Sequence, residues 1–203
     1  MNRWYKIIVV FFSLLFTVAL EAQEVSAKTA SRFAPNSVRL QYAGYIGMLS
    51  LGSTWTFKED KISLEYSFGY SPKQDAEKAI YTNAIKLLIT PNLDFNIGNK
   101  VNIKPLSLGL ASSYTFGNRF GKYRDNSKYP NGYYWWSTSV RVGLVYQLEA
   151  SVALNNKYFK RIGFYLESSI WDLGLFSYYG NSNRSHLHFF DIVVLGSGCR
   201  LYF

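Results

Sequence analysis

Residues 136–149 read WSTSVRVGLVYQLE, and apolar side chains alternate with polar or small ones through the whole stretch. A period of two is typical of a β-strand, because successive side chains point to opposite faces of the sheet. Two further stretches, 62–71 and 106–117, alternate in the same way. The repeated pattern predicts an all-β protein built from antiparallel strands.

The polar face of these three stretches separates two kinds of β-protein. It consists mainly of Ser, Gly and Ala with an occasional charge, whereas the wet face of a soluble β-sandwich usually carries longer polar side chains. Small residues suit the crowded interior of an up-and-down barrel of about eight strands, and the apolar face would then meet lipid. We therefore expect a transmembrane β-barrel, with a soluble secreted sandwich as the alternative.

Isolated charges on the polar faces follow the same logic. A buried charge without a partner is costly, so we expect these residues to pair across the barrel lumen: Glu65, Lys86, Arg141, Glu149, Glu167 and Arg200.

The N-terminus has the features of a secretory signal peptide, residues 1–22. Arg3 and Lys6 precede an apolar run of 14 residues, 7–20, which is the length of a signal core and short for a membrane-spanning helix. We expect cleavage after Ala22, with Ala27 as the second choice and an uncleaved anchor as the alternative. Residues 23–31 would then be a periplasmic segment and 32–203 the barrel.

Composition excludes other classes. Aromatic residues make up 18% of the chain and charged residues only 17%, which excludes intrinsic disorder. The single cysteine, Cys199, excludes an intramolecular disulfide or a zinc site of several cysteines. No phosphate-binding loop, HExxH or EF-hand pattern occurs, so we expect no cofactor and no metal. The formal charge of +9 is not taken to indicate nucleic acid, which such a barrel would not meet.

Residues 193–203 alternate as well and end on an aromatic residue, Phe203. Here the sequence resembles bacterial outer-membrane β-barrel proteins, whose last strand alternates and usually ends in Phe. The resemblance implies that Phe203 belongs to the signal read by the barrel-assembly machinery, and that the protein is a monomer in the outer membrane. It identifies no particular activity.

Turn signals divide the chain into strands when counted back from Phe203. We expect strands at about 187–203, 160–178, 134–151, 104–117, 80–91 and 62–71, with a periplasmic connection at 92–103. The remaining stretch, 32–57, has apolar residues at even positions first and at odd positions later. A bulge near 44–47 would leave seven strands, whereas a tight turn gives eight and returns both ends to the periplasm. We therefore predict a hairpin.

The expected outer loop 118–132 carries Arg119, Lys122, Arg124 and Lys128 against Asp125. Such a cluster suits the phosphates of lipopolysaccharide or another anionic lipid, or an acidic partner. The alternative is a solvated loop.

Aromatic residues concentrate near the outer strand ends, as in an interfacial girdle; a stacking platform for sugars or bases is the alternative. The residues are Tyr129, Tyr133, Tyr134, Trp135, Trp136, Tyr178 and Tyr179.

The two histidines, His186 and His188, lie close together near the expected outer rim. A catalytic site would pair one of them with a serine and an acid, and the candidates are Ser177, Ser182, Asp172 and Asp191. Lipid A deacylases and palmitoyltransferases are eight-stranded barrels with a His, a Ser and an acidic residue near the outer leaflet. The residues here do not match either family's motif one by one.

The expected role is therefore structural or interactive rather than enzymatic. Lipid A acyl modification is the first alternative. A narrow ion path past Arg141, Glu149 and Arg200 is the second, although eight strands form a packed core rather than a channel.

Overall fold

The computed structural model describes residues 34–73, 78–98, 100–117, 137–180 and 188–203. The barrel belongs to one compact unit, Pro35–Phe203. The predicted signal peptide 1–22, the segment 23–31 and the basic loop 118–132 lie outside the described residues.

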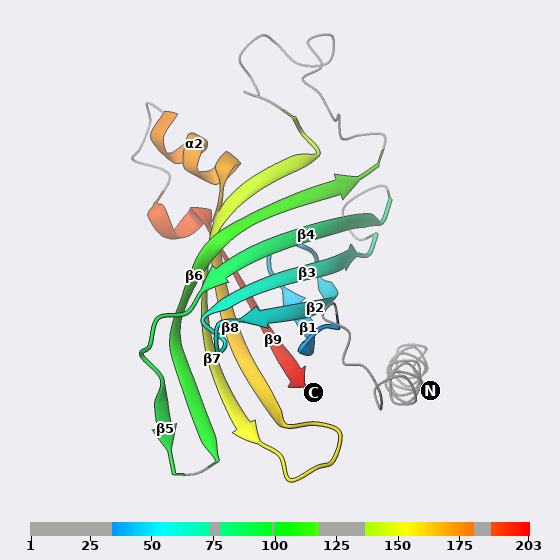
Figure 1. The fold of residues 1–203 in the computed structure, drawn as a ribbon. Helices are drawn as coiled ribbons and strands as arrows, with labels where there is room; N and C mark the ends of the chain where they lie inside the picture. The colour runs from blue at the N-terminus through cyan, green and yellow to red at the C-terminus, as the bar shows by residue number, and fades with distance from the viewer. Residues whose placement is uncertain (1–33, 74–77, 99, 118–136, 181–187) are drawn as a thin grey trace, which may run out of the picture. The chain divides into compact units, whose positions relative to one another are not determined.

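Eight antiparallel strands of the described chain close into a barrel (Figure 1). They pair in chain order, β4 pairs with β6, and β9 returns to β1. The strands of the ring are β1 Ser37–Ala43, β2 Leu49–Phe57, β3 Ile62–Ser71, β4 Ile80–Ile89, β6 Val101–Phe116, β7 Val140–Ala153, β8 Arg161–Trp171 and β9 Val193–Tyr202. A short strand, β5 Phe95–Ile97, pairs with β6 alone. The predicted all-β, up-and-down antiparallel barrel of about eight strands is confirmed.

The barrel has two ends, which we name by the segments found there. The terminal end holds the start of β1, the end of β9 and the turns 58–61 and 154–160. The loop end holds the turn 44–48, helix α2 (Asp172–Gly180) and the short 3-10 helix η2 (Phe189–Ile192).

The predicted hairpin within 32–57 is confirmed. Ala43 donates its backbone N–H to the carbonyl of Met48 at 2.9 Å. Ala43 and Gly44 have φ values of 58° and 95°, a left-handed conformation that glycine adopts without steric cost. This turn, rather than a bulge, moves the apolar side chains from even to odd positions.

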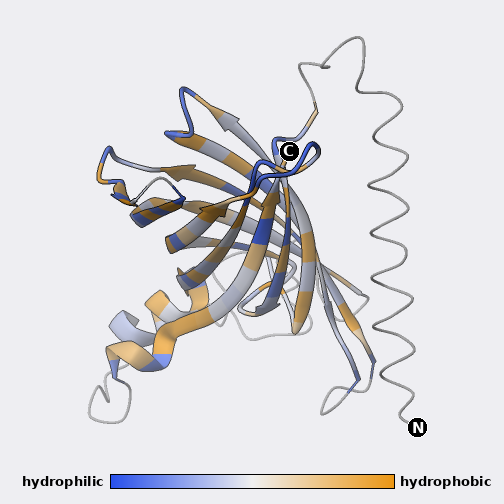
Figure 2. Ribbon diagram, turned by 90° about the horizontal axis from the view of Figure 1, so that it is seen from below, coloured by the Kyte–Doolittle hydropathy of each residue, from blue (hydrophilic) through white to orange (hydrophobic). Residues whose placement is uncertain are grey.

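The two faces of the strands differ as the alternation predicts. Along β3, Glu65 is fully buried, whereas its neighbour Tyr66 is 41% exposed. Figure 2 shows hydrophilic and hydrophobic residues alternating along the strands. Polar side chains therefore make up most of the interior, and apolar ones form the outer surface.

Apart from the start of β7, which lies at Val140 rather than near 134, strand ends differ from the expected ones in three places. The strand expected to reach 178 ends at Trp171 and continues as α2, and the strand expected from 187 begins at Val193 after η2. Asp172 accounts for the first change, because its carboxylate stabilises a helix N-terminus and it is buried beside Arg141. The expected connection 92–103 contains β5 and the start of β6, whose register shifts between Lys104 and Ser107 around Pro105, where proline cannot donate to the ladder.

Candidate functional site: the barrel interior

Six charged side chains meet in the middle of the barrel, and we call them the central ion-pair layer. Each comes from a different strand and is at most 6% exposed. They are Arg39 of β1, Glu65 of β3, Lys86 of β4, Glu149 of β7, Glu167 of β8 and Arg200 of β9. Three cations thus face three carboxylates, which makes the layer neutral.

Glu167 binds cations from two strands that do not neighbour its own, β1 and β4. Its carboxylate accepts a hydrogen bond from Lys86 Nζ at 2.6 Å and one from Arg39 Nη2 at 3.2 Å. Gln147 Nε2 donates to it at 2.7 Å. These contacts join β8 to β1, β4 and β7, so the carboxylate crosslinks the wall across the lumen.

Glu65 lies between two arginines and pairs with both. Arg39 and Arg200 lie directly opposite each other on β1 and β9, an arrangement that by itself destabilises a sheet. One oxygen of Glu65 pairs with Arg39 and the other with Arg200. Arg200 also pairs with Glu149 at 2.8 Å. The carboxylates therefore hold the two guanidinium groups side by side.

The glycines on the inner face provide room for this layer. A Cβ at Gly163 would lie 2.7 Å from the Glu149 carboxylate, and one at Gly198 would lie 2.5 Å from the Tyr165 hydroxyl. That hydroxyl accepts a hydrogen bond from Arg39 at 3.0 Å. The small residues of the polar face thus leave the space through which the long charged side chains cross the lumen.

An apolar plug covers the layer at the loop end. The 44–48 turn places Ile46, which is 2% exposed, against Gly69, where a Cβ would lie 2.3 Å from the Ile46 carbonyl oxygen. The Tyr45 ring stacks on Trp171 with centroids 4.0 Å apart. Trp171 belongs to a buried apolar cluster with Ala111, Val145 and Leu88, of which Leu88 lies nearer the terminal end.

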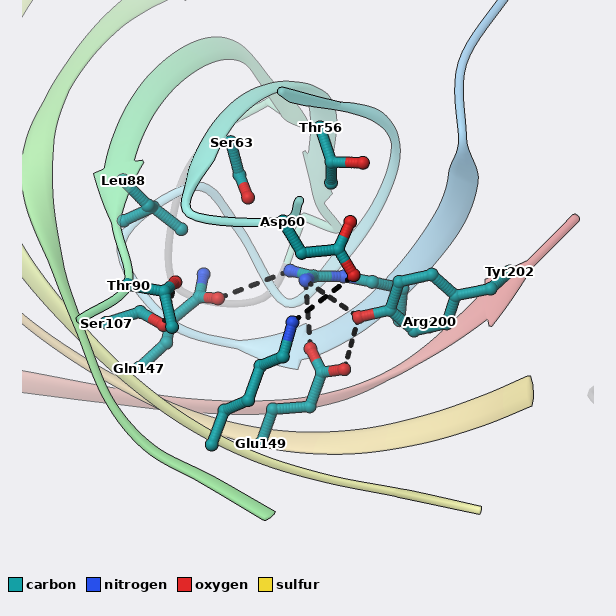
Figure 3. A pocket seen from close by; sticks show the side chains of 11 residues that line it. Thr56, Asp60, Ser63, Leu88, Thr90, Ser107, Gln147, Glu149, Arg200 and Tyr202 are labelled. Atoms are coloured by element: carbon teal, nitrogen blue, oxygen red, sulfur yellow. Dashed lines mark hydrogen bonds and ion pairs between the residues drawn. The ribbon is translucent and has the colours of Figure 1, made fainter. Parts of the chain in front are cut away.

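A small polar pocket lies at the terminal end, with room for about one water molecule (Figure 3). Asp60, Glu149, Arg200 and Tyr202 line it. Asp60 comes from the β2–β3 turn and reaches across the opening to Arg161 of β8 and Lys104 of β6. We call Asp60, Lys104 and Arg161 the rim cluster.

The pKa of Asp60 reflects these contacts. Partial burial alone would raise the pKa, but the hydrogen bond from Arg161 and the charges of Lys104 and Arg161 outweigh it and lower the pKa to about 2. The backbone of the turn is unusual, since Lys58, Glu59 and Asp60 all have φ between 51° and 65°. Three consecutive left-handed residues cost free energy, so ion pairs of Asp60 that hold the turn in place offset part of that cost.

The structure places all six predicted lumen charges inside the barrel. Five belong to the central ion-pair layer, whereas Arg141 lies nearer the loop end and pairs with Asp172 at 3.4 Å. Sequence reasoning missed Arg39, Asp60, Lys104 and Arg161. Arg39 had a usable signal, because it alternates with Val38 and Leu40. The partners of Asp60 are 44 and 101 residues away in the chain, and no local pattern reveals them.

The candidate catalytic residues within the described chain are not assembled into a Ser-His-acid set. The His188 backbone N–H donates to the Asp191 carboxylate at 2.8 Å, so Asp191 closes the first turn of η2. Asp172 is buried beside Arg141, and no hydrogen bond links Ser177 to His188 within the described chain. His186, Ser182 and the basic residues Arg119, Lys122, Arg124 and Lys128 lie outside the described residues, as do five of the seven predicted girdle residues.

Phe203 lies at the terminal end beside the start of the barrel. Its backbone N–H donates to the Asn36 carbonyl at 3.0 Å, and its ring lies 6.0 Å from that of Phe159. Cys199 is half-buried and shares the outer face of β9 with Leu201.

Among the residues with described positions, no three His, Cys, Asp or Glu side chains gather as metal ligands would. None of the described helices is both long enough and apolar enough to cross a membrane. Comparison with known proteins gives no match to any family model, curated protein or solved structure.

Proposed function

We propose that this protein is an integral barrel of the bacterial outer membrane with a structural or surface-interaction role, and that its interior does not conduct. The observation that carries the proposal is the apolar belt on the outside of the barrel. Every strand of the ring contributes at least one exposed large apolar side chain, and their exposed fractions run from 36% at Leu64 to 68% at Leu195. The others include Tyr42, Tyr66, Leu87, Leu110, Leu144 and Leu166.

Such a belt is costly in water. A soluble monomer rarely exposes a continuous apolar patch of more than about 600 Å², whereas here the apolar residues occur on all eight strands. In contact with lipid tails, the same apolar surface carries no free-energy penalty of hydration. The closed barrel also pairs the backbone groups of every strand edge, as a membrane-spanning sheet requires. This protein places charged side chains in its interior and apolar side chains on its surface, whereas a water-soluble protein does the opposite. The reversed distribution supports the membrane proposal.

A charge placed in the belt tests the proposal. Leu87, Leu110 and Leu144 lie side by side on β4, β6 and β7. If lipid covers them, Leu110→Arg will destabilise the barrel by about 2–4 kcal/mol in liposomes. The control Leu93→Arg changes an exposed leucine outside the strands (49% exposed, against 63% for Leu110) and is expected to have little effect. Denaturant unfolding of both variants measures the difference, and an unchanged stability for Leu110→Arg would exclude the membrane barrel.

The closed interior is the second part of the proposal. The ion pairs of the central layer occupy the middle of the lumen, and eight strands leave room only for side chains. We expect no steady conductance from the purified protein in planar bilayers. Discrete ion-selective openings would contradict this part and favour the ion path.

Contact with anionic lipid is the third part, and it rests on the sequence of loop 118–132, whose net charge is +3. Arginine and lysine clusters bind phosphate groups strongly. We expect binding to lipopolysaccharide that weakens with salt and falls at least tenfold when Arg119, Lys122, Arg124 and Lys128 are all changed to Gln. The matched control changes four exposed lysines in the turns of the terminal end, Lys58, Lys61, Lys157 and Lys160, to Gln. Equal affinities for the two variants would contradict lipid contact by this loop.

A further inference from the structure

Helices α2 and η2 form one aromatic unit on top of two neighbouring strands, and we call it the α2–η2 unit (172–180 and 188–192). Helix α2 continues β8, and η2 leads into β9. The two helices pack closely because Gly174 has no side chain, since a Cβ there would lie 3.1 Å from Ile192. The Tyr178 ring contacts Phe189 edge-on with centroids 6.1 Å apart.

The unit exposes an unusual amount of aromatic surface. Phe190 is 82% exposed, Tyr179 65% and Phe189 45%. The ring contacts made by Phe189 and Tyr178 leave the outer side of Phe190 uncovered by described residues. The unit carries no Lys or Arg, and of its two carboxylates Asp172 is buried, whereas Asp191 is exposed and accepts the backbone N–H of His188. Its surface is therefore mainly aromatic, with tyrosine hydroxyls and one carboxylate at the start of η2, and such a mixed surface suits the boundary between lipid and water better than either bulk water or an acidic partner.

The position of the unit indicates what covers it. Directly along the same two strands, Phe164 and Leu166 of β8 and Leu195 of β9 are each at least 60% exposed and belong to the apolar belt. Figure 1 shows α2 and η2 beside each other at one end of the strands, and in Figure 2 the helical segment lies to one side of the strands, at the lower left. The aromatic surface thus extends the belt at the loop end.

We propose that the α2–η2 unit lies in the interface of the outer leaflet, with Phe190 and Tyr179 among the lipid headgroups and upper acyl chains. Aromatic side chains prefer this level of a bilayer, where a ring is half in hydrocarbon and a hydroxyl meets water. The unit would then set the depth and the tilt of the barrel on the β8–β9 side. This inference rests on the proposed membrane location.

The test uses the single cysteine of the chain. In a Cys199→Ser background, a spin label is attached in turn to Phe190→Cys, to Leu110→Cys and to Lys157→Cys, in protein folded into liposomes. Leu110 lies in the belt and Lys157 in a turn at the opposite end. Collision rates with oxygen, which concentrates in lipid, and with a water-soluble nickel chelate measure the environment of each label. Tyr179→Cys replaces Phe190→Cys if that variant does not fold.

The expected result is a graded series. Oxygen collisions should dominate strongly at Leu110, should exceed nickel collisions moderately at Phe190, and should be the weaker of the two at Lys157. A lipid-embedded Leu110 label with a water-exposed Phe190 label would overturn this inference and leave the membrane barrel intact. Shielding of the Phe190 label from both reagents, with spin–spin broadening, would replace lipid with a second copy of the chain. A water-exposed Leu110 label would overturn the membrane location and this inference with it.

Discussion

The central ion-pair layer and the rim cluster use the same chemistry under different exposure to water. In both, a carboxylate from one wall of the barrel binds two cations from other strands. Glu167 is 4% exposed, and Asp60 is 29% exposed. Removing one partner of a buried ion pair leaves the other charge uncompensated in a low dielectric, whereas near the surface water replaces the lost partner. We therefore expect the loss of a carboxylate to lower the free energy of unfolding more when that carboxylate is more deeply buried.

The largest effect is expected for Glu167→Ala. The change leaves Lys86 and Arg39 without a shared carboxylate, and we expect a loss of about 3–5 kcal/mol in the free energy of unfolding. Urea titration of the protein folded in liposomes measures it. Because an apolar replacement of both partners removes the uncompensated charge, Glu167→Leu with Lys86→Met should recover part of the loss. If Glu167→Ala lowers the free energy of unfolding less than the rim substitution Asp60→Asn does, burial does not determine the contribution of these carboxylates.

At the rim, Asp60→Asn should cost less, about 1–2 kcal/mol at pH 7, after allowance for the exposure of the side chain. The amide keeps the size of the side chain and loses the charge that binds Arg161 and Lys104. The same urea titration measures it, with Asp94→Asn as the control in an exposed loop. An effect equal to that of Glu167→Ala would show that exposure does not weaken the rim pairs.

The rim contribution should disappear in acid. The pKa of Asp60 is lowered from 3.8 to about 2 in the folded protein, so the unfolded state binds the proton first as the pH falls. The stabilisation is complete above about pH 5 and is lost between about pH 4 and pH 2. The stability difference between the natural protein and Asp60→Asn, measured from pH 7 to pH 2, should shrink in this window. A difference that stays constant down to pH 2 would mean that Asp60 is not held by its cations.

The same contrast explains what the sequence could predict. The central layer lies on regular strands, where alternation assigns each side chain to a face, so the inward position of Glu65 and Arg200 follows from the sequence alone. The sequence does not predict which carboxylate binds which cation, because the pairing depends on the register and curvature of the closed barrel.

Both ends of the barrel depart from the alternation. Asp60 lies in a left-handed turn, where the period of two does not apply. At the other end, Trp171, Leu173 and Leu175 continue the strand pattern into α2. The helix begins there because Asp172 pairs with Arg141 on a neighbouring strand, and a contact between residues so far apart in the chain has no local signature.

The smallest expected changes in stability come from replacing the two cations of the rim cluster, and they should differ between Arg161 and Lys104. Arg161 hydrogen-bonds Asp60 and also lies over the Tyr202 ring, with its guanidinium carbon 4.0 Å from the ring centroid. Lys104 contacts Asp60 alone at 3.3 Å. We expect Arg161→Gln to cost about 1 kcal/mol and Lys104→Gln about half of that. In the Asp60→Asn background the Lys104 effect should vanish, whereas part of the Arg161 effect should remain because the ring contact does not need the carboxylate. Equal residual effects in that background would show that the Tyr202 contact contributes nothing, and the rim would then be a simple surface ion pair.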